Sequence, residues 1–274
     1  MKPNLVRQSA AYAVLLIAAV MILFPFWIAL SNALMTEAES ATYPPKWFPS
    51  SLHLENFIKV WDTIPVGRFI LNSFVTSGVI TIGQIVTSCM AAYAFAFLRF
   101  PGRKVLFALF MATMMIPWEV TVIPNYLTVR SWGWLDSYPG LTIPFLASAF
   151  GTFLMRQFFL QLPKELMEAA RIDGCGHIRI FLSIAVPLSM PGLATLGVYS
   201  FLSNWNMYLW PLLITNTESM RTVQIGVSML QFAEVTAWNM VMAGIVMVLL
   251  PSLVLLAVGL GRLVGGLTAG SLKG

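Results

Sequence analysis

Side chains capable of chemistry are scarce in this chain, because charged residues make up only 10% of its 274 residues. Of the two cysteines and two histidines, only Cys175 and His177 lie close together, and one such pair is a weak signal for zinc. Neither His53 nor His177 stands in the arrangement of a base beside a nucleophile. The sequence also lacks a glycine-rich loop with a lysine, which would hold the phosphates of a nucleotide. We therefore expect a protein that is not an enzyme, with no catalytic residues, no metal and no cofactor of its own.

The polar stretch 163–174 has instead the features of a short helix with defined ends. Pro163 suits the first helical position, where its missing N–H costs nothing. Glu165 lies near the beginning and Arg171 near the end, which matches the helix dipole. Gly174 follows as a stop in the left-handed conformation. Because the stretch lies between two long apolar segments, we expect it on a loop at one side of a membrane.

One face of this short helix is suited to docking. The residues that recur on it at helical spacing are Leu166, Ala169, Ala170 and Asp173. The two alanines allow another backbone to approach closely, and Glu168 offers an anchor for a cation. Helices that lie on lipid headgroups usually have a basic face opposite bulky apolar residues. The small face and the acidic start favour docking to a protein over docking to lipid.

The composition is that of an integral membrane protein. Hydrophobic residues make up 58% of the chain, and the mean hydropathy is +0.80. The basic residues are dispersed, so the pI of about 9.4 does not indicate nucleic acid binding.

The first apolar run is too long for a signal peptide, so we interpret it as the first membrane span. We expect an all-α polytopic protein that forms a single domain over 1–274, with six spans at about 12–31, 69–97, 105–128, 141–158, 184–214 and 238–260.

Loop charges predict the orientation of these spans. Eleven of the 16 Lys and Arg residues lie on the side of both termini, residues 98–104 and residues 159–183, with Arg156 counted at the border. Five lie on the other side. Since cytoplasmic loops carry the excess of basic residues, both termini and the 159–183 loop are expected in the cytoplasm.

Polar residues inside the spans are candidates for a substrate path, because they are costly in lipid and tend to face the interior. The candidates are Glu119, Asn204, Trp205, Asn206, Tyr208 and Asn72. Amides can bind hydroxyl groups, and an indole ring can stack on a sugar. An alternative is open for each: Glu119 could pair with a partner subunit, and the amides could join helices by hydrogen bonds. Gln84 and Asn239 carry the same ambiguity.

The polar loop resembles a known family of proteins. Glu168-Ala169-Ala170, then Gly174, then Ile184-x-x-Pro187 is similar to the cytoplasmic loop of the permeases of ATP-binding-cassette importers. The family usually has Leu before the final proline, where this chain has Val186. Further matching motifs, similar to the carbohydrate-type permeases related to the second maltose permease, are Asn72-Ser73-Phe74, Phe100-Pro101-Gly102-Arg103, Met115-Ile116-Pro117, Trp205-Asn206 and Trp210-Pro211-Leu212.

The resemblance implies a type I importer permease fold and a set of partners. These are a second homologous permease, a homodimeric ATPase that binds ATP and magnesium, and a substrate-binding protein outside the bacterial cell membrane. The 159–183 loop would form the coupling helix, which seats in the ATPase and moves the pore by alternating access. The residues that would make this contact are Glu168, Ala169, Ala170, Asp173 and Gly174.

The resemblance also indicates a substrate. Pro117-Trp118-Glu119-Val120, Leu135-Asp136-Ser137-Tyr138 and Arg156-Gln157-Phe158-Phe159 resemble the second permease subunits of sn-glycerol-3-phosphate importers. This resemblance implies import of that compound or of glycerophosphodiesters such as glycerophosphocholine. A sugar or oligosaccharide permease of the same architecture is the alternative. A secondary transporter is a further alternative, although we find no convincing internal repeat, and Glu119 is the only charge within the spans apart from Arg156 at the border of the fourth. A purely structural membrane scaffold would leave the polar loop unexplained.

Overall fold

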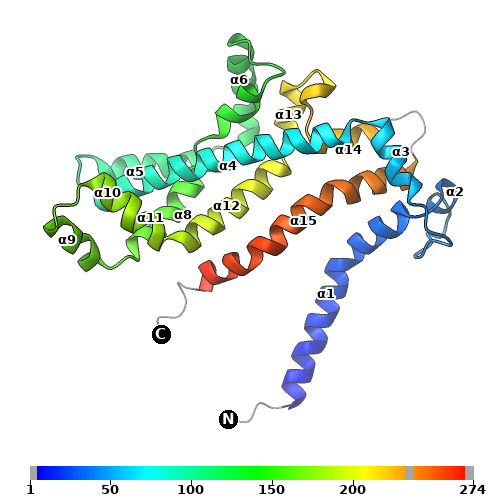
Figure 1. Ribbon diagram of the computed structural model, residues 1–274, viewed down its shortest axis with the longest axis horizontal. Helices are drawn as coiled ribbons and strands as arrows, with labels where there is room; N and C mark the ends of the chain where they lie inside the picture. Colours follow the sequence, from blue (N-terminus) through cyan, green and yellow to red (C-terminus); the bar gives the residue numbers. More distant parts are fainter. Residues whose placement is uncertain (1–4, 232–236, 269–274) are drawn as a thin grey trace. The chain divides into compact units, whose positions relative to one another are not determined.

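The computed structural model describes residues 5–231 and 237–268, and all regular structure in these ranges is helical (Figure 1). The helices in chain order are α1 Leu5–Ala33, α2 Glu37–Ser40, α3 Glu55–Thr63, α4 Val66–Phe97, α5 Arg103–Ala112, η1 Thr113–Met115, α6 Trp118–Ser131, α7 Tyr138–Thr142, η2 Ile143–Phe145, α8 Ala149–Leu160, α9 Lys164–Ile172, α10 His177–Ile180, η3 Phe181–Ala185, α11 Val186–Leu188, α12 Met190–Trp205, α13 Leu209–Ile214, η4 Glu218–Met220, α14 Val223–Gln231 and α15 Trp238–Thr268. The chain forms two compact units, residues 1–67 with 226–251 and residues 68–225 with 252–274.

Three helices are long and apolar enough to cross a membrane, and three bent helix pairs pass the same test. The long helices are Gln8–Ala33, Val66–Phe97 and Trp238–Ala257. The bent pairs are Arg103–Met115 with Trp118–Ser131, Tyr138–Phe145 with Ala149–Leu160, and His177–Leu188 with Met190–Trp205. By length and composition the described residues therefore allow up to six spans.

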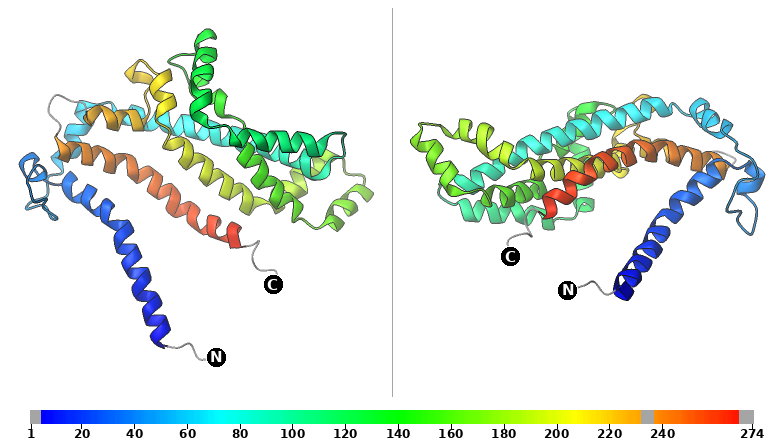
Figure 2. Two further views of the ribbon diagram at one scale, coloured as in Figure 1. Left: turned by 180° about the vertical axis from the view of Figure 1, so that it is seen from behind. Right: turned by 60° about the horizontal axis from the view of Figure 1, so that its bottom comes forward.

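Each bend lies at or near a proline, but the hydropathy of the sequence does not reveal the bend angles. α6 is bent by 95° relative to α5, because Ile116 precedes Pro117 and adopts an extended conformation (φ −82°, ψ 115°). Figures 1 and 2 show α6 turning away from α5. The 76° bend before α12 follows Pro187, and Pro191 lies in the first turn of α12. The preceding segment Phe181–Ala185 is a π-helix, a local adjustment that accommodates carbonyls left without a donor.

The second unit is held by two clusters of buried side chains. One joins the end of α4 to α8, α9, α10 and α12 through residues such as Tyr93, Phe159 and Leu196. The other joins α6 to α7 and α13 through Val129, Leu141 and Trp210. α5 has no buried residue, whereas Val122 and Val129 of α6 are buried in the second of these clusters. The bend of α6 away from α5 therefore allows α6 to bury apolar surface.

α4 satisfies the backbone at the break between η2 and α8. Gln84 Nε2 donates to the carbonyl of Phe145 (2.9 Å), and Thr87 Oγ1 donates to that of Leu146 (2.8 Å). Gln84 Oε1 also accepts from Ser200 Oγ of α12 (2.6 Å). A bilayer offers no water to such groups, so the polar side chains of α4 replace it. For Gln84, this geometry corresponds to the alternative of joining helices.

A carboxylate fixes the loop after α13 to the loop before α7. Asp136 Oδ1 accepts from the backbone N–H of Asn216 (2.7 Å) and of Thr217 (2.9 Å), and from the Thr217 hydroxyl (3.0 Å). Partial burial raises the pKa of Asp136, but these hydrogen bonds outweigh that effect and lower it. The charged carboxylate therefore stabilises the pairing of two loops that are 80 residues apart in the sequence.

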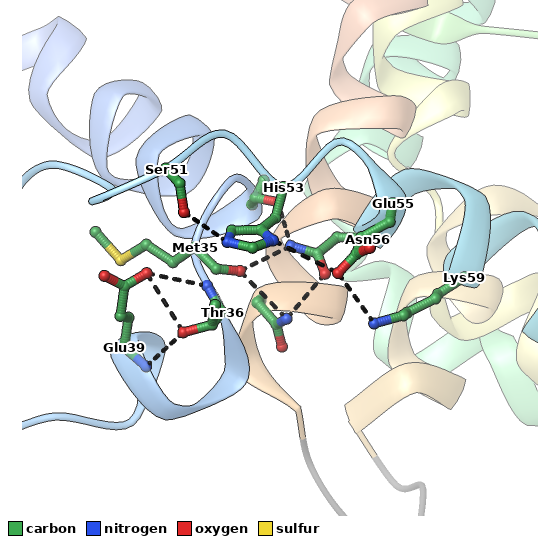
Figure 3. A network of polar contacts seen from close by, with 10 residues as sticks. Met35, Thr36, Glu39, Ser51, His53, Glu55, Asn56 and Lys59 are labelled. Carbon is green, nitrogen blue, oxygen red and sulfur yellow. Dashed lines mark hydrogen bonds and ion pairs between the residues drawn. The ribbon is translucent and has the colours of Figure 1, made fainter.

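A polar network organises the first unit, and Figure 3 shows most of it. The buried Asn56 donates to the carbonyls of Ala33 (2.9 Å) and Met35 (2.8 Å), and it accepts from Asn239 Nδ2 of α15 (3.0 Å). This network joins the end of α1 to α3 and α15. Like Gln84, Asn239 thus has the role of joining helices.

The turn after α1 is stabilised by Glu39. The carboxylate closes a capping box with Thr36 and accepts from Ser50 and from Lys46 (3.2 Å). The Ser50 hydroxyl, the Thr36 N–H and the Lys46 ammonium together lower the pKa of Glu39 to about 2. The chain between Thr36 and Ser50 is therefore an ordered surface turn.

The hydrogen bonds of α4 to the α8 break can be tested with a matched pair of substitutions. Thr87→Val removes the donor to Leu146, and we expect a loss of about 0.5–1.5 kcal/mol in the free energy of unfolding, as for one hydrogen bond. Thr128→Val is the control, because the Thr128 hydroxyl donates to the carbonyl of Pro124 in its own helix and not to another helix. Thermal unfolding of both variants in lipid nanodiscs measures the difference. Equal melting temperatures would contradict the assigned role of α4.

Candidate coupling helix and substrate path

α9 is a short helix with a complete C-terminal cap. Gly174 has φ +78°, and its N–H donates to the carbonyl of Arg171 (3.0 Å). The N–H of Cys175 donates to the carbonyl of Ala170 (2.9 Å). These two bonds form a Schellman motif, so the expected left-handed stop is present. At the other end Pro163 is the N-cap (φ −57°, ψ 129°), one residue earlier than the first helical position expected for it.

The inward face of α9 packs on its own unit. Met167 and Ala170 are buried, with 6% and 7% of their surface exposed, against the cluster that contains Tyr93 and Phe159. The helical spacing predicts Ala170 on the docking face, but in the structure Ala170 lies on the opposite side and is buried. Successive helix residues are rotated by about 100°, so the burial of Met167 carries Ala170, three residues later, inward with it.

The outward face of α9 is acidic with one large apolar residue. Glu165, Glu168 and Ala169 are exposed, and Ile172 has 87% of its surface exposed. Asp173 and Gly174 are exposed at the end of the helix. Sequence reasoning missed Ile172, although its spacing of four residues from Glu168 would have placed both on one face. A protein docked on this face would therefore meet two carboxylates and an exposed isoleucine together.

α9 is followed by a segment that packs closely against α4. The Tyr93 hydroxyl of α4 lies 3.4 Å from His177 Nδ1 of α10, and the Tyr93 ring packs edge-on against Phe181 (centroids 5.2 Å apart). The π-helix and the bend before α12 follow directly. A displacement of α9 would therefore reach α4, α8 and the broken fifth span through close-packed side chains.

The candidate path residues on α12 are brought together but are differently exposed. Asn204 and Trp205 are buried, and Asn204 Nδ2 donates to the carbonyl of Ser200 within α12 (2.7 Å). The Trp205 ring packs against Phe74 (centroids 4.9 Å apart) and Phe201 (5.7 Å). Its indole N–H has no hydrogen-bond acceptor within the described part of the chain.

Three other candidates lie at or near exposed positions. Asn206 and Tyr208 are exposed where α12 ends, and Asn206 Oδ1 accepts from Gln224 Nε2 (3.2 Å). Glu119 is exposed in the first turn of α6, where a carboxylate is favoured by the helix dipole. Within residues 5–231 and 237–268, Glu119 forms no ion pair with a basic side chain.

Asn72 is fully engaged in the protein interior. Its amide donates to the carbonyls of Ser219 and Arg221, both at 2.9 Å, and it accepts from the Tyr138 hydroxyl (2.7 Å). Both amide hydrogens are therefore used, and none of the side chain is exposed. This geometry corresponds to the alternative in which Asn72 joins segments of the fold.

Sequence comparisons place these features among transport proteins. The family described as "Binding-protein-dependent transport system inner membrane component" matches residues 84–260. The sn-glycerol-3-phosphate transport system permease protein UgpE of Yersinia pestis bv. Antiqua (strain Antiqua) is 41% identical over 251 residues, which cover 89% of each chain. UgpE of Escherichia coli (strain UTI89 / UPEC) is 40% identical over 265 residues, 94% of each chain. The expected family resemblance is thereby confirmed.

Solved structures share the fold. A bacterial ABC transporter involved in the import of the acidic polysaccharide alginate contains a chain that matches with a TM-score of 0.81 and 23% identity, over 94% of this chain and 96% of that one. A bacterial alginate ABC transporter in complex with a pentasaccharide-bound periplasmic protein matches with a TM-score of 0.66 and 15% identity, over 93% of each chain. The predicted all-α importer permease fold is thereby confirmed.

The cap of α9 can be tested with two glycines that differ in φ. Gly174→Val forces a β-branched residue to φ +78°, which costs about 1–2 kcal/mol, so we expect faster hydrogen exchange in α9 and reduced transport. Gly176→Val is the control, because Gly176 has φ −71° and a Cβ there meets no atom within 4 Å. Exchange mass spectrometry and substrate uptake measure the two effects. Equal behaviour of the variants would show that the cap does not matter.

Proposed function

The chain belongs to the family of inner membrane components of binding-protein-dependent transport systems, and we propose that it imports sn-glycerol-3-phosphate or a glycerophosphodiester such as glycerophosphocholine. The observation that carries this proposal is identity of 40–41% to UgpE permeases over about nine-tenths of the chain. In this role the chain is a non-catalytic subunit that forms half of the translocation pore. The alginate transporters match at 15–23% identity, so they support only the fold. The proposed substrate rests on the UgpE sequences.

The assembly would contain the partners that the family requires. A second homologous permease completes the pore, two ATPase subunits bind ATP and magnesium, and an external protein delivers the substrate. The multi-pass chain lies in the inner membrane of a bacterium, with both termini in the cytoplasm. The orientation rests on the excess of basic residues on the side of the termini and of α9.

α9 is the element on which the ATPase would act. Glu168, Ala169, Asp173 and Gly174 lie on its exposed surface, and Ile172 adds an apolar anchor to it. Ala170 would contribute to coupling indirectly, because it packs on the inner side of α9 against the cluster formed by α4 and α8. Closure of the ATPase dimer would push α9, and the packed side chains would carry that motion into the spans.

The substrate would pass the exposed polar residues of the second unit. Three candidate residues are accessible to a solute, Glu119, Asn206 and Tyr208. The other three are buried and would support the wall of the path without contacting the solute, namely Asn72, Asn204 and Trp205. A carboxylate such as Glu119 repels an anionic phosphate, so its role would be that of a gate residue and not of a ligand.

Reconstituted transport tests the substrate. The assembled transporter in liposomes, supplied with its binding protein, is expected to take up radiolabelled sn-glycerol-3-phosphate when ATP is present inside. Its ATPase rate should rise with the glycerophosphate-loaded binding protein. Stimulation by a disaccharide-loaded binding protein alone would contradict the assignment and favour a sugar permease.

Docking of the ATPase tests α9. Glu168→Lys and Ile172→Asp are each expected to weaken association of the ATPase subunits at least about 30-fold, as for a central interface residue worth 2 kcal/mol or more. Leu52→Asp is the control, since Leu52 is similarly exposed (72%) but lies on the other side of the membrane in the proposed orientation. Co-purification and titration of the ATPase measure the effect. Normal association of both α9 variants would exclude this face as the docking surface.

A further inference from the structure

A basic cavity lies where the chain turns from α4 into α5. Arg99, Arg103 and Lys104 line it together with Phe100, Gly102 and Val105, and its volume is about 470 Å³. Three cationic side chains in six residues are unusual in a chain with 10% charged residues. The proposed docking surface on α9 does not include them.

The turn holds these cations in a defined arrangement. Gly102 has φ +74° and is the N-cap of α5, without a side-chain hydrogen bond to the first turn. Arg103 Nη1 donates to the carbonyl of Leu98 (2.8 Å), which closes the turn. Arg99 and Lys104 are exposed, and none of the ion pairs among the described residues involves a cation of this turn. The cavity therefore carries positive charge without a counterion from the chain.

An apolar surface continues directly from this cavity. Val105 lines the cavity with 63% of its surface exposed, and Leu109, four residues later on α5, is 61% exposed. Phe107 of α5 packs instead against Phe95 (centroids 5.3 Å apart) and lies beneath the Arg156 guanidinium (4.2 Å). α5 thus has one face in the protein and one free apolar face that begins at the cations.

We propose that Arg99, Arg103 and Lys104 bind the phosphate of an anionic phospholipid in the leaflet on the side of α9, with its acyl chains along Val105 and Leu109. Leu98, just before the cations, packs against the cluster that holds α9, so cavity and coupling helix lie at the same end of the second unit.

The chemistry of the surface selects this occupant. A phospholipid combines a negative headgroup with an apolar tail, and basic residues at the membrane surface attract anionic lipids. The apolar face would gain nothing from a free phosphate ion. The exposed face of α9, proposed for the ATPase, is acidic, which makes the basic cavity a poor continuation of the same protein interface.

Lipid titration of the assembled, delipidated transporter tests the site. Native mass spectrometry measures binding of phosphatidylglycerol and of zwitterionic phosphatidylcholine. One basic residue near the surface contributes about fivefold in affinity, so Arg99→Gln with Lys104→Gln should weaken phosphatidylglycerol binding about 30-fold and leave phosphatidylcholine unchanged. Arg99→Lys with Lys104→Arg, which keeps both charges, is the matched control and should bind normally.

Three outcomes would overturn the proposal. Unchanged phosphatidylglycerol affinity in the glutamine double variant would exclude a headgroup site. Competition by inorganic phosphate at the concentration of the lipid would indicate a site for a soluble anion. Loss of the ATPase subunits from the glutamine double variant would indicate a protein interface. If the double variant does not fold in the membrane, Lys104→Gln alone is expected to weaken binding about fivefold, and normal binding by this single variant would also refute the site.

Discussion

A membrane helix that breaks must find partners for the backbone groups it frees, because hydrocarbon offers none. This constraint shapes the second unit, where three candidate spans bend by 95°, 47° and 76°. α4 meets it with a continuous helix of 32 residues that carries polar side chains at the level of a break. Gln84, Thr87 and Ser88 donate to three carbonyls around the junction of η2 and α8. The broken span formed by α7, η2 and α8 therefore depends on the continuous helix α4 for hydrogen bonds at its break.

The same helix approaches its neighbours closely. A Cβ at Gly83 of α4 would clash with Leu146, and one at Gly151 of α8 would clash with Ser88. The glycines bring the backbones near enough for short polar side chains to reach carbonyls across the junction. At one end α4 holds the 215–222 loop through Asn72, and at the other Tyr93 supports α9. α4 therefore connects both ends of the unit mechanically.

Two surfaces at the α9 end of the unit differ in charge, and this difference separates their proposed partners. The exposed face of α9 carries Glu165 and Glu168, and the entry to α5 carries Arg99 and Lys104. On the first, Ile172 is the most exposed of the large apolar residues of α9, and the second continues into the apolar face of α5 that contains Val105 and Leu109. Electrostatics thus directs a protein to one surface and a lipid headgroup to the other without any overlap of residues.

The sequence by itself determined the family, the all-α membrane class and the C-terminal end of α9. These depend on local signals: apolar runs, the left-handed stop at Gly174, and a motif with fixed spacing. Only the tertiary structure decided that Ala170 faces inward, that Asn72 has no free hydrogen-bonding group, and that α6 turns 95° from α5. The first two depend on partners more than 60 residues away, Tyr93 for Ala170 and Tyr138 for Asn72, whereas the turn lies at Pro117 and only its angle needs the folded structure. A helical pattern shows which residues share a face, but packing against distant segments decides which face is buried.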